Sequence, residues 1–156
     1  MNYRRSTRYA LYAALEMAAA PGGETVTAAQ VAAKYRLPPT VLAKVIQRLV
    51  HAGLATGTRG VSGGYQLVRP ASEVTLLEVV EVFEGPRAAS TCVLGECGVG
   101  GCGQFAECRL RRLFDEVDEQ ARATFGSVTL ETLISPRRPL ELAALTPTRS
   151  SPAASR

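Results

Sequence analysis

The chain has no cysteine outside one stretch of 17 residues, which holds Cys92, Cys97, Cys102 and Cys108. These four cysteines cannot link distant parts of a fold, so they are read as one local site. The sequence contains no C-x-x-C pair, which argues against a thiol oxidoreductase or a small electron carrier. His51 is the only histidine and is too isolated to suggest a Cys-His nucleophilic pair. We therefore do not expect an enzyme.

The chain also lacks an apolar run of the roughly 18 residues that a membrane-spanning helix needs. Arg4, Arg5 and Arg8 before A-L-Y-A-A-L imitate a signal peptide, but Glu16 interrupts the apolar stretch. We expect a cytoplasmic protein with no membrane partner. Cytoplasmic thiols are kept reduced, so clustered cysteines favour a metal or redox-sensing site over a disulfide framework.

Acidic residues are scarce in the first half of the chain. Residues 1 to 70 contain nine Lys/Arg against Glu16 and Glu24, a net charge of +7, whereas residues 71 to 156 contain nine against twelve, a net of −3. The 16.6 kDa chain is long enough for one ordinary domain, or a small domain with an appendage. Because the cationic residues are concentrated in one part, the N-terminal half is the candidate nucleic-acid surface.

Capping signals and helical periodicity predict three helices in this half. With Ser6 or Thr7 as its cap, the first covers residues 8–20 and stops at Pro21-Gly22-Gly23. The T-A-A-Q capping box opens a second that ends near residue 35, and P-P-T opens a third that ends at Gly53. The third helix has an apolar stripe of Val41, Leu42, Val45, Ile46, Leu49 and Val50. Its polar side carries Thr40, Lys44, Gln47, Arg48 and His51. Two such helices joined by a tight turn are typical of a helix-turn-helix.

Two short strands, residues 54–56 and 65–68, flank the sequence G-T-R-G-V-S-G-G and predict a β-hairpin, interpreted as a wing. Gly63 and Gly64 suit the turn whatever the function. Arg59 stands between glycines at the tip, where it could enter the negative potential of a narrow minor groove. Tyr65 is interpreted as a strand residue that packs the base of the wing. The predicted fold class is mainly α with a small β-hairpin wing, a winged helix-turn-helix.

A second capping box, T-L-L-E, opens a helix at Thr75 that ends at Gly85-Pro86. After the cysteines, one face of a long helix carries Leu110, Leu113, Phe114, Val117, Ala121 and Phe125. This apolar face packs either against a second copy of the chain or back onto the winged N-terminal region of the same chain. We therefore divide the chain into a DNA-binding region (1–85), a cysteine-rich cluster-binding loop (86–108), a dimerisation helix with a short cap (109–134) and a flexible tail (135–156).

In this order the features resemble the family of cluster-binding winged-helix repressors typified by IscR and NsrR. The resemblance covers about residues 1 to 135, and its hallmarks are R-Y-A-L-Y-A-A-L, L-V-H-A-G-L, R-G-V-S-G-G-Y-Q-L, F-E-G-P and C-R-L. It implies a homodimeric transcriptional repressor on double-stranded, pseudo-palindromic promoter DNA, with the third helix in the major groove and the wing arginine in the minor groove. The positions that match the DNA-binding residues are Thr40, Lys44, Arg48, Arg59 and Gly60. Pro38 and Ala43 depart from the polar residues that are frequent there.

The resemblance also implies an iron-sulfur cluster, [2Fe-2S] or [4Fe-4S], that senses nitric oxide, redox state or iron-sulfur status. The C-x4-C-x5-C spacing of Cys97, Cys102 and Cys108 matches the nitric-oxide-responsive repressors. Relatives complete the cluster with a histidine or a first-helix aspartate, but Arg111 and Arg8 stand at those positions here, and arginine cannot ligate iron. The candidates for the fourth place are therefore Cys92, Glu16, Glu96, Glu107, a small molecule or water, with Cys92 favoured.

Two other readings of the cysteines stay open. Four thiolates suit tetrahedral zinc, although structural zinc sites usually pair their ligands in two C-x2-4-C knuckles, which the even spacing here lacks. A metal-free thiol switch is the other reading. The five glycines among residues 92 to 108 favour a bound metal or cluster, since glycine lets a backbone wrap closely around it.

Overall fold

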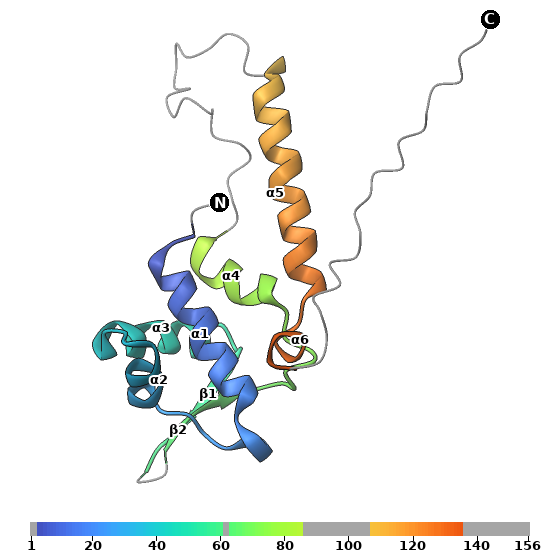
Figure 1. The fold of residues 1–156 in the computed structure, drawn as a ribbon. Coiled ribbons are helices and arrows are strands. Elements are labelled where there is room, and N and C mark those ends of the chain that lie inside the picture. The colour runs from blue at the N-terminus through green and yellow to red at the C-terminus, as the bar shows by residue number, and fades with distance from the viewer. Residues whose placement is uncertain (1–2, 61–62, 86–106, 136–156) are drawn as a thin grey trace, which may run out of the picture.

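The computed structural model describes residues 3–60, 63–85 and 107–135 (Figure 1). Helices make up most of this part, and its one sheet is an antiparallel hairpin of two strands. The elements are α1 Arg5–Ala19, the short 3-10 turn η1 Pro21–Gly23, α2 Ala28–Tyr35, α3 Pro39–His51, β1 Ala55–Thr58, β2 Gly64–Leu67, α4 Leu76–Glu84, α5 Arg109–Ser127 and α6 Leu130–Ile134. The predicted class, mainly α with a small hairpin, is confirmed.

Two of the helices start as their sequences predict. At α2 the Thr27 side chain accepts from the Gln30 N–H and the Gln30 side chain accepts from the Thr27 N–H, a complete capping box. Thr75 and Glu78 form the same reciprocal pair at the start of α4. The predicted start of α1 was wrong, because the helix already begins at Arg5 without a side-chain cap. Thr7 lies inside it, fully buried, and donates to the Glu84 carboxylate.

The core lies where α1 packs against α3, α4 and α6. Alanines on α1, Ala10, Ala13 and Ala14, let the neighbouring elements approach closely. From α3 the core receives Leu42, Val45, Ile46 and Leu49. Val41 was predicted to belong to this stripe, but its side chain is 43% exposed. The buried positions define the inner face, and residue 41, about 100° before Leu42 on the helix, falls outside that arc.

The hairpin is tied to the segment before α2. Its register pairs Ala55 with Leu67 and Thr58 with Gly64. Tyr65 also exchanges two backbone hydrogen bonds with Val26, of 2.8 and 2.9 Å, so this segment runs beside β2. A side chain at Gly64 would place its Cβ 2.8 Å from the Thr25 Cβ, which explains why only glycine fits there. Strand β2 is therefore paired on both edges, with β1 and with this segment. The pairing fixes the wing to the rest of residues 3–85, which we call the head.

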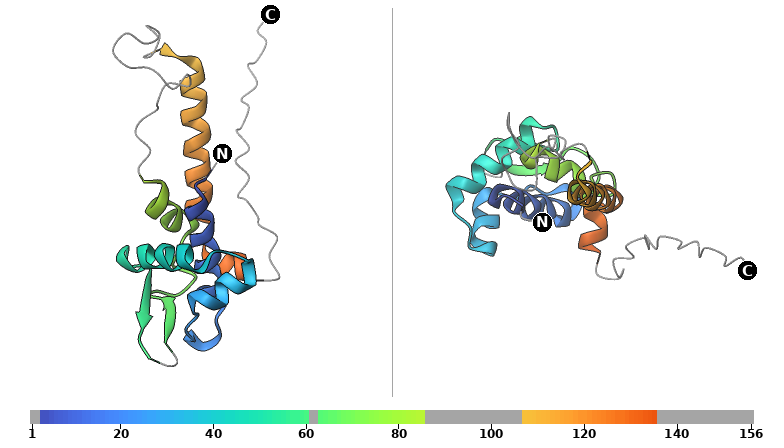
Figure 2. Two further views of the ribbon diagram at one scale, coloured as in Figure 1. Left: turned by 90° about the vertical axis from the view of Figure 1, so that its left-hand side faces the viewer. Right: turned by 90° about the horizontal axis from the view of Figure 1, so that it is seen from above.

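The long helix α5 stands away from the head, at the end opposite the tip of the hairpin (Figures 1 and 2). The chain then returns, and α6 joins the core through the fully buried Leu130. Two backbone hydrogen bonds of 2.9 Å, from the Leu76 N–H to Val128 O and from the Leu130 N–H to Val74 O, join the start of α4 to the end of α5. No helix in the described ranges is both long enough and apolar enough to span a membrane.

Candidate nucleic-acid interface

The outer surface of α3 carries the polar residues that the sequence predicts. Thr40, the second residue of the helix, and Lys44, one turn further on, are both exposed. The turn that leads into this helix is tight because Arg36 adopts a left-handed conformation, with φ of 53°, and its N–H donates to the Ala33 carbonyl. The predicted turn at Arg36-Leu37 is confirmed, and it presents the first residues of α3 outward.

The wing places Arg59 and Gly60 at its exposed tip. Gly60 has a φ of 124°, which favours glycine, and its carbonyl accepts from the Gly63 N–H at 2.9 Å. A Cβ at Gly63 would lie 2.5 Å from the Thr58 carbonyl oxygen and 2.8 Å from that of Gly60. Backbone atoms cannot give way as a flexible side chain can. The glycine is therefore required by the close turn that presents Arg59.

The wing and the second half of α3 border one groove. Gln47 on α3 donates a 3.0 Å hydrogen bond to the Tyr65 hydroxyl on β2. A groove of about 450 Å³ runs between the start of α2, α3 and the wing, and Gln47, Arg59 and Gly60 line it. Tyr65 is half-buried and packs against the core, which confirms its predicted place at the base of the wing. The groove thus reaches the polar side of α3 at Gln47 and extends to the wing tip, whereas Thr40 and Lys44 are not part of its lining.

Arg48 differs from the other predicted DNA-binding residues in using its guanidinium within the chain. Its Nη2 donates to the carbonyl oxygen of Val82 at 2.5 Å. Its Cζ lies 4.4 Å from the centre of the Phe83 ring. Both partners belong to the last turns of α4, and neither could be inferred from the sequence spacing. Whether Arg48 also contacts DNA stays a prediction.

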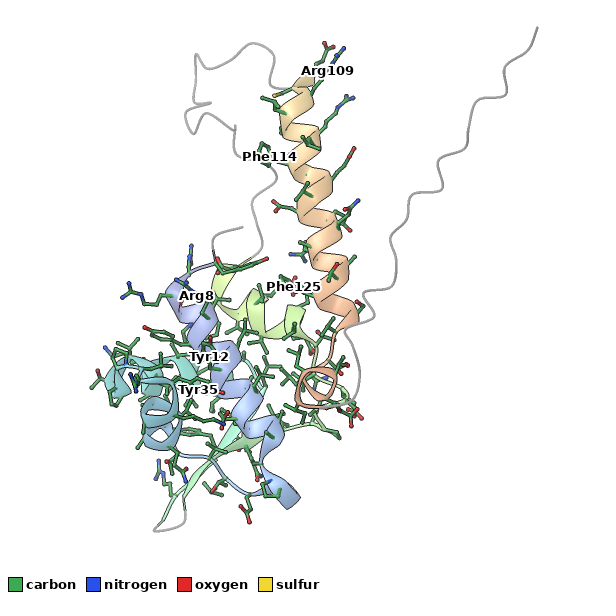
Figure 3. All side chains as sticks on the ribbon, viewed as in Figure 1. Arg8, Tyr12, Tyr35, Arg109, Phe114 and Phe125 are labelled. Carbon is green, nitrogen blue, oxygen red and sulfur yellow. The ribbon has the colours of Figure 1, made fainter. Side chains whose placement is uncertain are left out.

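A polar cluster joins α1 to α2. Lys34 donates to both carboxylate oxygens of Glu16, at 2.6 and 2.8 Å, and the Tyr35 hydroxyl donates to one of them at 2.6 Å. Burial alone would raise the pKa of Glu16, but the hydrogen bonds from Lys34 and Tyr35 outweigh it and lower the pKa. The bond to Glu16, helped by burial, raises the pKa of Tyr35 to about 12. The ring of Tyr12 stacks on Tyr35 at 4.4 Å, and Figure 3 shows the two together.

Of the four cysteines, only Cys108 lies among the described residues; Cys92, Cys97 and Cys102 lie outside them, as does Glu96. Cys108 is half-buried, free of a disulfide, and stands immediately before α5. No group of three His, Cys, Asp or Glu side chains that could hold a metal occurs within the described ranges. The ligand set of Cys92, Cys97, Cys102 and Cys108 therefore stays a prediction. Among the alternatives for the fourth ligand, Glu16 already accepts hydrogen bonds from Lys34 and Tyr35.

The apolar face of α5 is divided between two environments. Near its end Phe125 packs on the Tyr3 ring at 5.7 Å, and Arg122 forms an ion pair with Glu81 of α4. In its first half, the exposed apolar side chains are Leu110, Leu113, Phe114 and Val117. Figure 3 shows Phe114 well beyond the head, whereas Phe125 lies beside it. The apolar residues near the end of α5 are thus covered by the head. Those in its first half are not covered by any of the described residues.

Comparison with known proteins gives a consistent picture. A family model described as Rrf2, an iron-dependent transcriptional regulator, matches residues 3–136. BadM of Rhodopseudomonas palustris, named as an HTH-type transcriptional regulator, is 33% identical over 135 residues, which cover 86% of this chain and 81% of BadM.

Two solved structures share the fold. CymR, the global cysteine regulator of B. subtilis, has a TM-score of 0.67 and 25% identity over 86% of this chain and 96% of its own. IscR of T. potens has a TM-score of 0.67 and 21% identity over 86% of each chain. At that identity, the likeness to IscR concerns the fold alone.

Proposed function

Because this chain belongs to the Rrf2 family of transcriptional regulators, we propose that it is a homodimeric repressor that binds promoter DNA under the control of its cysteine site. Family membership confirms that the protein is a regulator and not an enzyme. A regulator that acts on promoters works where the chromosome lies, so we place it in the cytoplasm. The observation that carries the proposal is the groove shared by α3 and the wing, together with the exposed polar side of α3.

On this surface α3 enters the major groove, where the first residues of a reading helix reach the base edges. Thr40 and Lys44 are the proposed contacts there. The exposed Val41 stands between them and supplies an aliphatic group suited to the methyl group of thymine. Arg59 and Gly60 follow the wing into the minor groove, and Arg48 remains a candidate on the side of α3 that faces α4. The net charge of +7 on residues 1 to 70 supports binding to a polyanion.

Salt dependence tests the proposal as a whole. If several phosphates are contacted, the affinity for a duplex selected with the wild-type protein from a randomised pool should fall by roughly an order of magnitude or more between 50 and 200 mM salt. Fluorescence anisotropy across a salt series measures this directly. Binding that is absent, or that does not respond to salt, would contradict the DNA-binding proposal.

Arg59→Ala is expected to weaken binding by about 1 to 3 kcal/mol and to relax the preference for sequences with a narrow minor groove. The side chain lies at the exposed wing tip, so the folded state should be little affected. Arg69→Ala is the matched control, because it removes the same charge from the residue where the chain leaves the hairpin, paired there with Glu78. Equal losses in the two variants would remove the special role of Arg59.

For the cysteine site we propose an iron-sulfur cluster held by Cys97, Cys102 and Cys108, with Cys92 as the fourth ligand. Thiolates are the ligands that such clusters use, and the family description as iron-dependent supports this choice. When bound, the cluster would supply iron that reacts with nitric oxide or oxidants. The four cysteines would hold it between the end of α4 and the start of α5, where a change in the loop can alter the placement of the two heads of a dimer.

The second candidate is regulation by zinc or by the thiols alone. It is compatible with the likeness to CymR, which is 25% identical to this chain and whose description as a global cysteine regulator names no iron or cluster. The even spacing of the cysteines fits zinc less well, because structural zinc sites usually contain two separate pairs of closely spaced ligands, and these cysteines are not grouped in pairs. Both alternatives keep the DNA-binding proposal unchanged.

Anaerobic purification separates these candidates. A cluster predicts visible absorption between about 300 and 450 nm that bleaches on addition of nitric oxide. Cys92→Ala should change the spectrum or the iron content if Cys92 is a ligand, and Cys97→Ala serves as the positive control. A colourless protein with stoichiometric zinc would reject the cluster, and a Cys92→Ala spectrum equal to wild type would leave only three cysteine ligands.

A further inference from the structure

The last turn of α4 has a carbonyl group that its own helix cannot satisfy. The last four carbonyls of any helix lack the usual partner four residues on. In α4, Glu81 O still accepts from the Gly85 N–H at 3.1 Å. The corresponding partner of Val82 would be residue 86, which is proline and has no N–H. The Val82 carbonyl therefore needs a donor from elsewhere in the chain.

Arg48 of α3 supplies this donor, through Nη2 at 2.5 Å. Its guanidinium also lies against the ring of Phe83, with 4.4 Å between Cζ and the ring centre. Phe83 is only 1% exposed, so the core fixes the ring in place. A cation at the carboxyl end of a helix is favoured by the helix dipole, and a guanidinium over an aromatic face adds a further attraction. Planar geometry allows arginine to make both contacts, which lysine cannot reproduce.

The same end of α4 is also held by Thr7 of α1 and by Arg4, the residue just before α1. Arg4 Nη1 donates to the carbonyl oxygen of Phe83 at 3.0 Å, and the Arg4 N–H donates to Glu84 Oε1 at 2.9 Å. The buried Thr7 hydroxyl donates to that same carboxylate oxygen. Val82, Phe83 and Glu84 are thus bound by side chains from α3, from Arg4 and from α1. This end is also the last described point of the chain before the stretch that holds Cys92, Cys97 and Cys102.

We propose that Arg48 is a positioning residue that couples the end of α4 to α3, and so transmits the state of the cysteine site to the DNA-reading surface. The inference rests on the proposed DNA-binding function. Lys44 lies one helical turn before Arg48, so a shift of Arg48 with α4 moves the reading residues of α3. A regulatory coupling needs a contact that differs between two states, and the Arg48 contact to α4 is that element.

The experiment compares full-length wild type, Arg48→Ala, Arg48→Lys and Phe83→Leu, each with intact cysteines and with Cys97→Ser. The probe is one duplex selected with the wild-type protein from a randomised pool, titrated over a salt series. In wild type, Cys97→Ser should change the affinity about 5- to 150-fold, the usual range of allosteric coupling. In the other three variants this ratio should fall towards one, and in Phe83→Leu the slope of affinity against salt should stay that of wild type.

Phe83→Leu keeps the test valid if the Arg48 variants fold poorly, because a buried ring cannot touch DNA and leucine retains most of its apolar volume. Lys44→Ala is the reference for the loss of a cationic DNA contact, which is expected to lower the salt slope. One outcome would overturn the coupling and make Arg48 a DNA contact. In that outcome Arg48→Ala lowers the salt slope as Lys44→Ala does, Arg48→Lys restores the slope, and Cys97→Ser still changes the affinity in both Arg48 variants. If wild type itself binds but does not respond to Cys97→Ser, cysteine control falls together with the coupling. A wild-type response that survives in all three variants overturns only the coupling.

Discussion

Phe114→Asp is expected to convert the protein into a monomer and to lower its affinity for a two-site operator by about 100-fold or more, as losses at central aromatic contacts do. Phe114 is 52% exposed, and Leu110, Leu113 and Val117 are exposed beside it on the same helix. Such a contiguous apolar face is typical of an interface. An aspartate at its centre would have to be buried without a partner on each copy, which costs far more than the lost ring alone.

Sedimentation velocity at several protein concentrations measures the oligomeric state, and anisotropy with a selected duplex measures binding. Ala123→Asp is the matched control, since it introduces the same charge on the same helix about 180° away, where the side chain is exposed. The control should remain dimeric and bind normally. A Phe114→Asp variant that sediments as a dimer, or a wild type that is monomeric, would refute this interface.

Phe83→Ala is expected to lower the free energy of unfolding by about 3 to 5 kcal/mol, the usual cost of emptying a buried aromatic site. The side chain is 1% exposed and packs where α4 meets α1 and α3, and its ring also supports the Arg48 guanidinium. A domain of this kind is stable by only about 5 to 15 kcal/mol in total, so the variant should approach the limit of folding. The truncation also removes the ring on which the Arg48 guanidinium lies. It should therefore weaken DNA binding more than a substitution elsewhere that lowers stability by the same amount.

Urea denaturation followed by circular dichroism gives this difference, with the slope of the transition as a check on two-state behaviour. Val68→Ala is the control, because that side chain is 54% exposed just after β2 and should change stability by less than about 0.5 kcal/mol. A loss for Phe83→Ala no larger than that of the control would show that Phe83 is not part of a tightly packed core.

The features that the sequence predicts well depend on residues close together in the chain. The capping boxes at Thr27 and Thr75 need only a partner three residues on, and both form as expected. The hairpin depends on glycines within its own turn, and its strands differ from the predicted bounds by one or two residues. The surface of α3 follows from helical period, apart from Val41 at the edge of the buried arc.

The features that the sequence did not predict depend on contacts between distant segments. Thr7 resembles a helix cap, but its partner Glu84 is 77 residues away. Arg48 resembles a DNA contact because it lies on the polar side of α3, yet its carbonyl partner is 34 residues further along. One local clue to it was present, since Pro86 shows that the Val82 carbonyl lacks a helical partner. The identity of the metal ligands depends on residues outside the described part and so rests on their spacing.

The backbone bonds between the start of α4 and the residues just after α5 close the span from Leu76 to Val128, in which α4 belongs to the core and α5 extends beyond it. Its two ends are held side by side, whatever number of residues lies between them. Closing a flexible loop of twice the length costs only about 0.6 kcal/mol more. The stretch between α4 and α5 could therefore vary in length at little cost in free energy, because the bonds at the base of the span already hold both helices to the core.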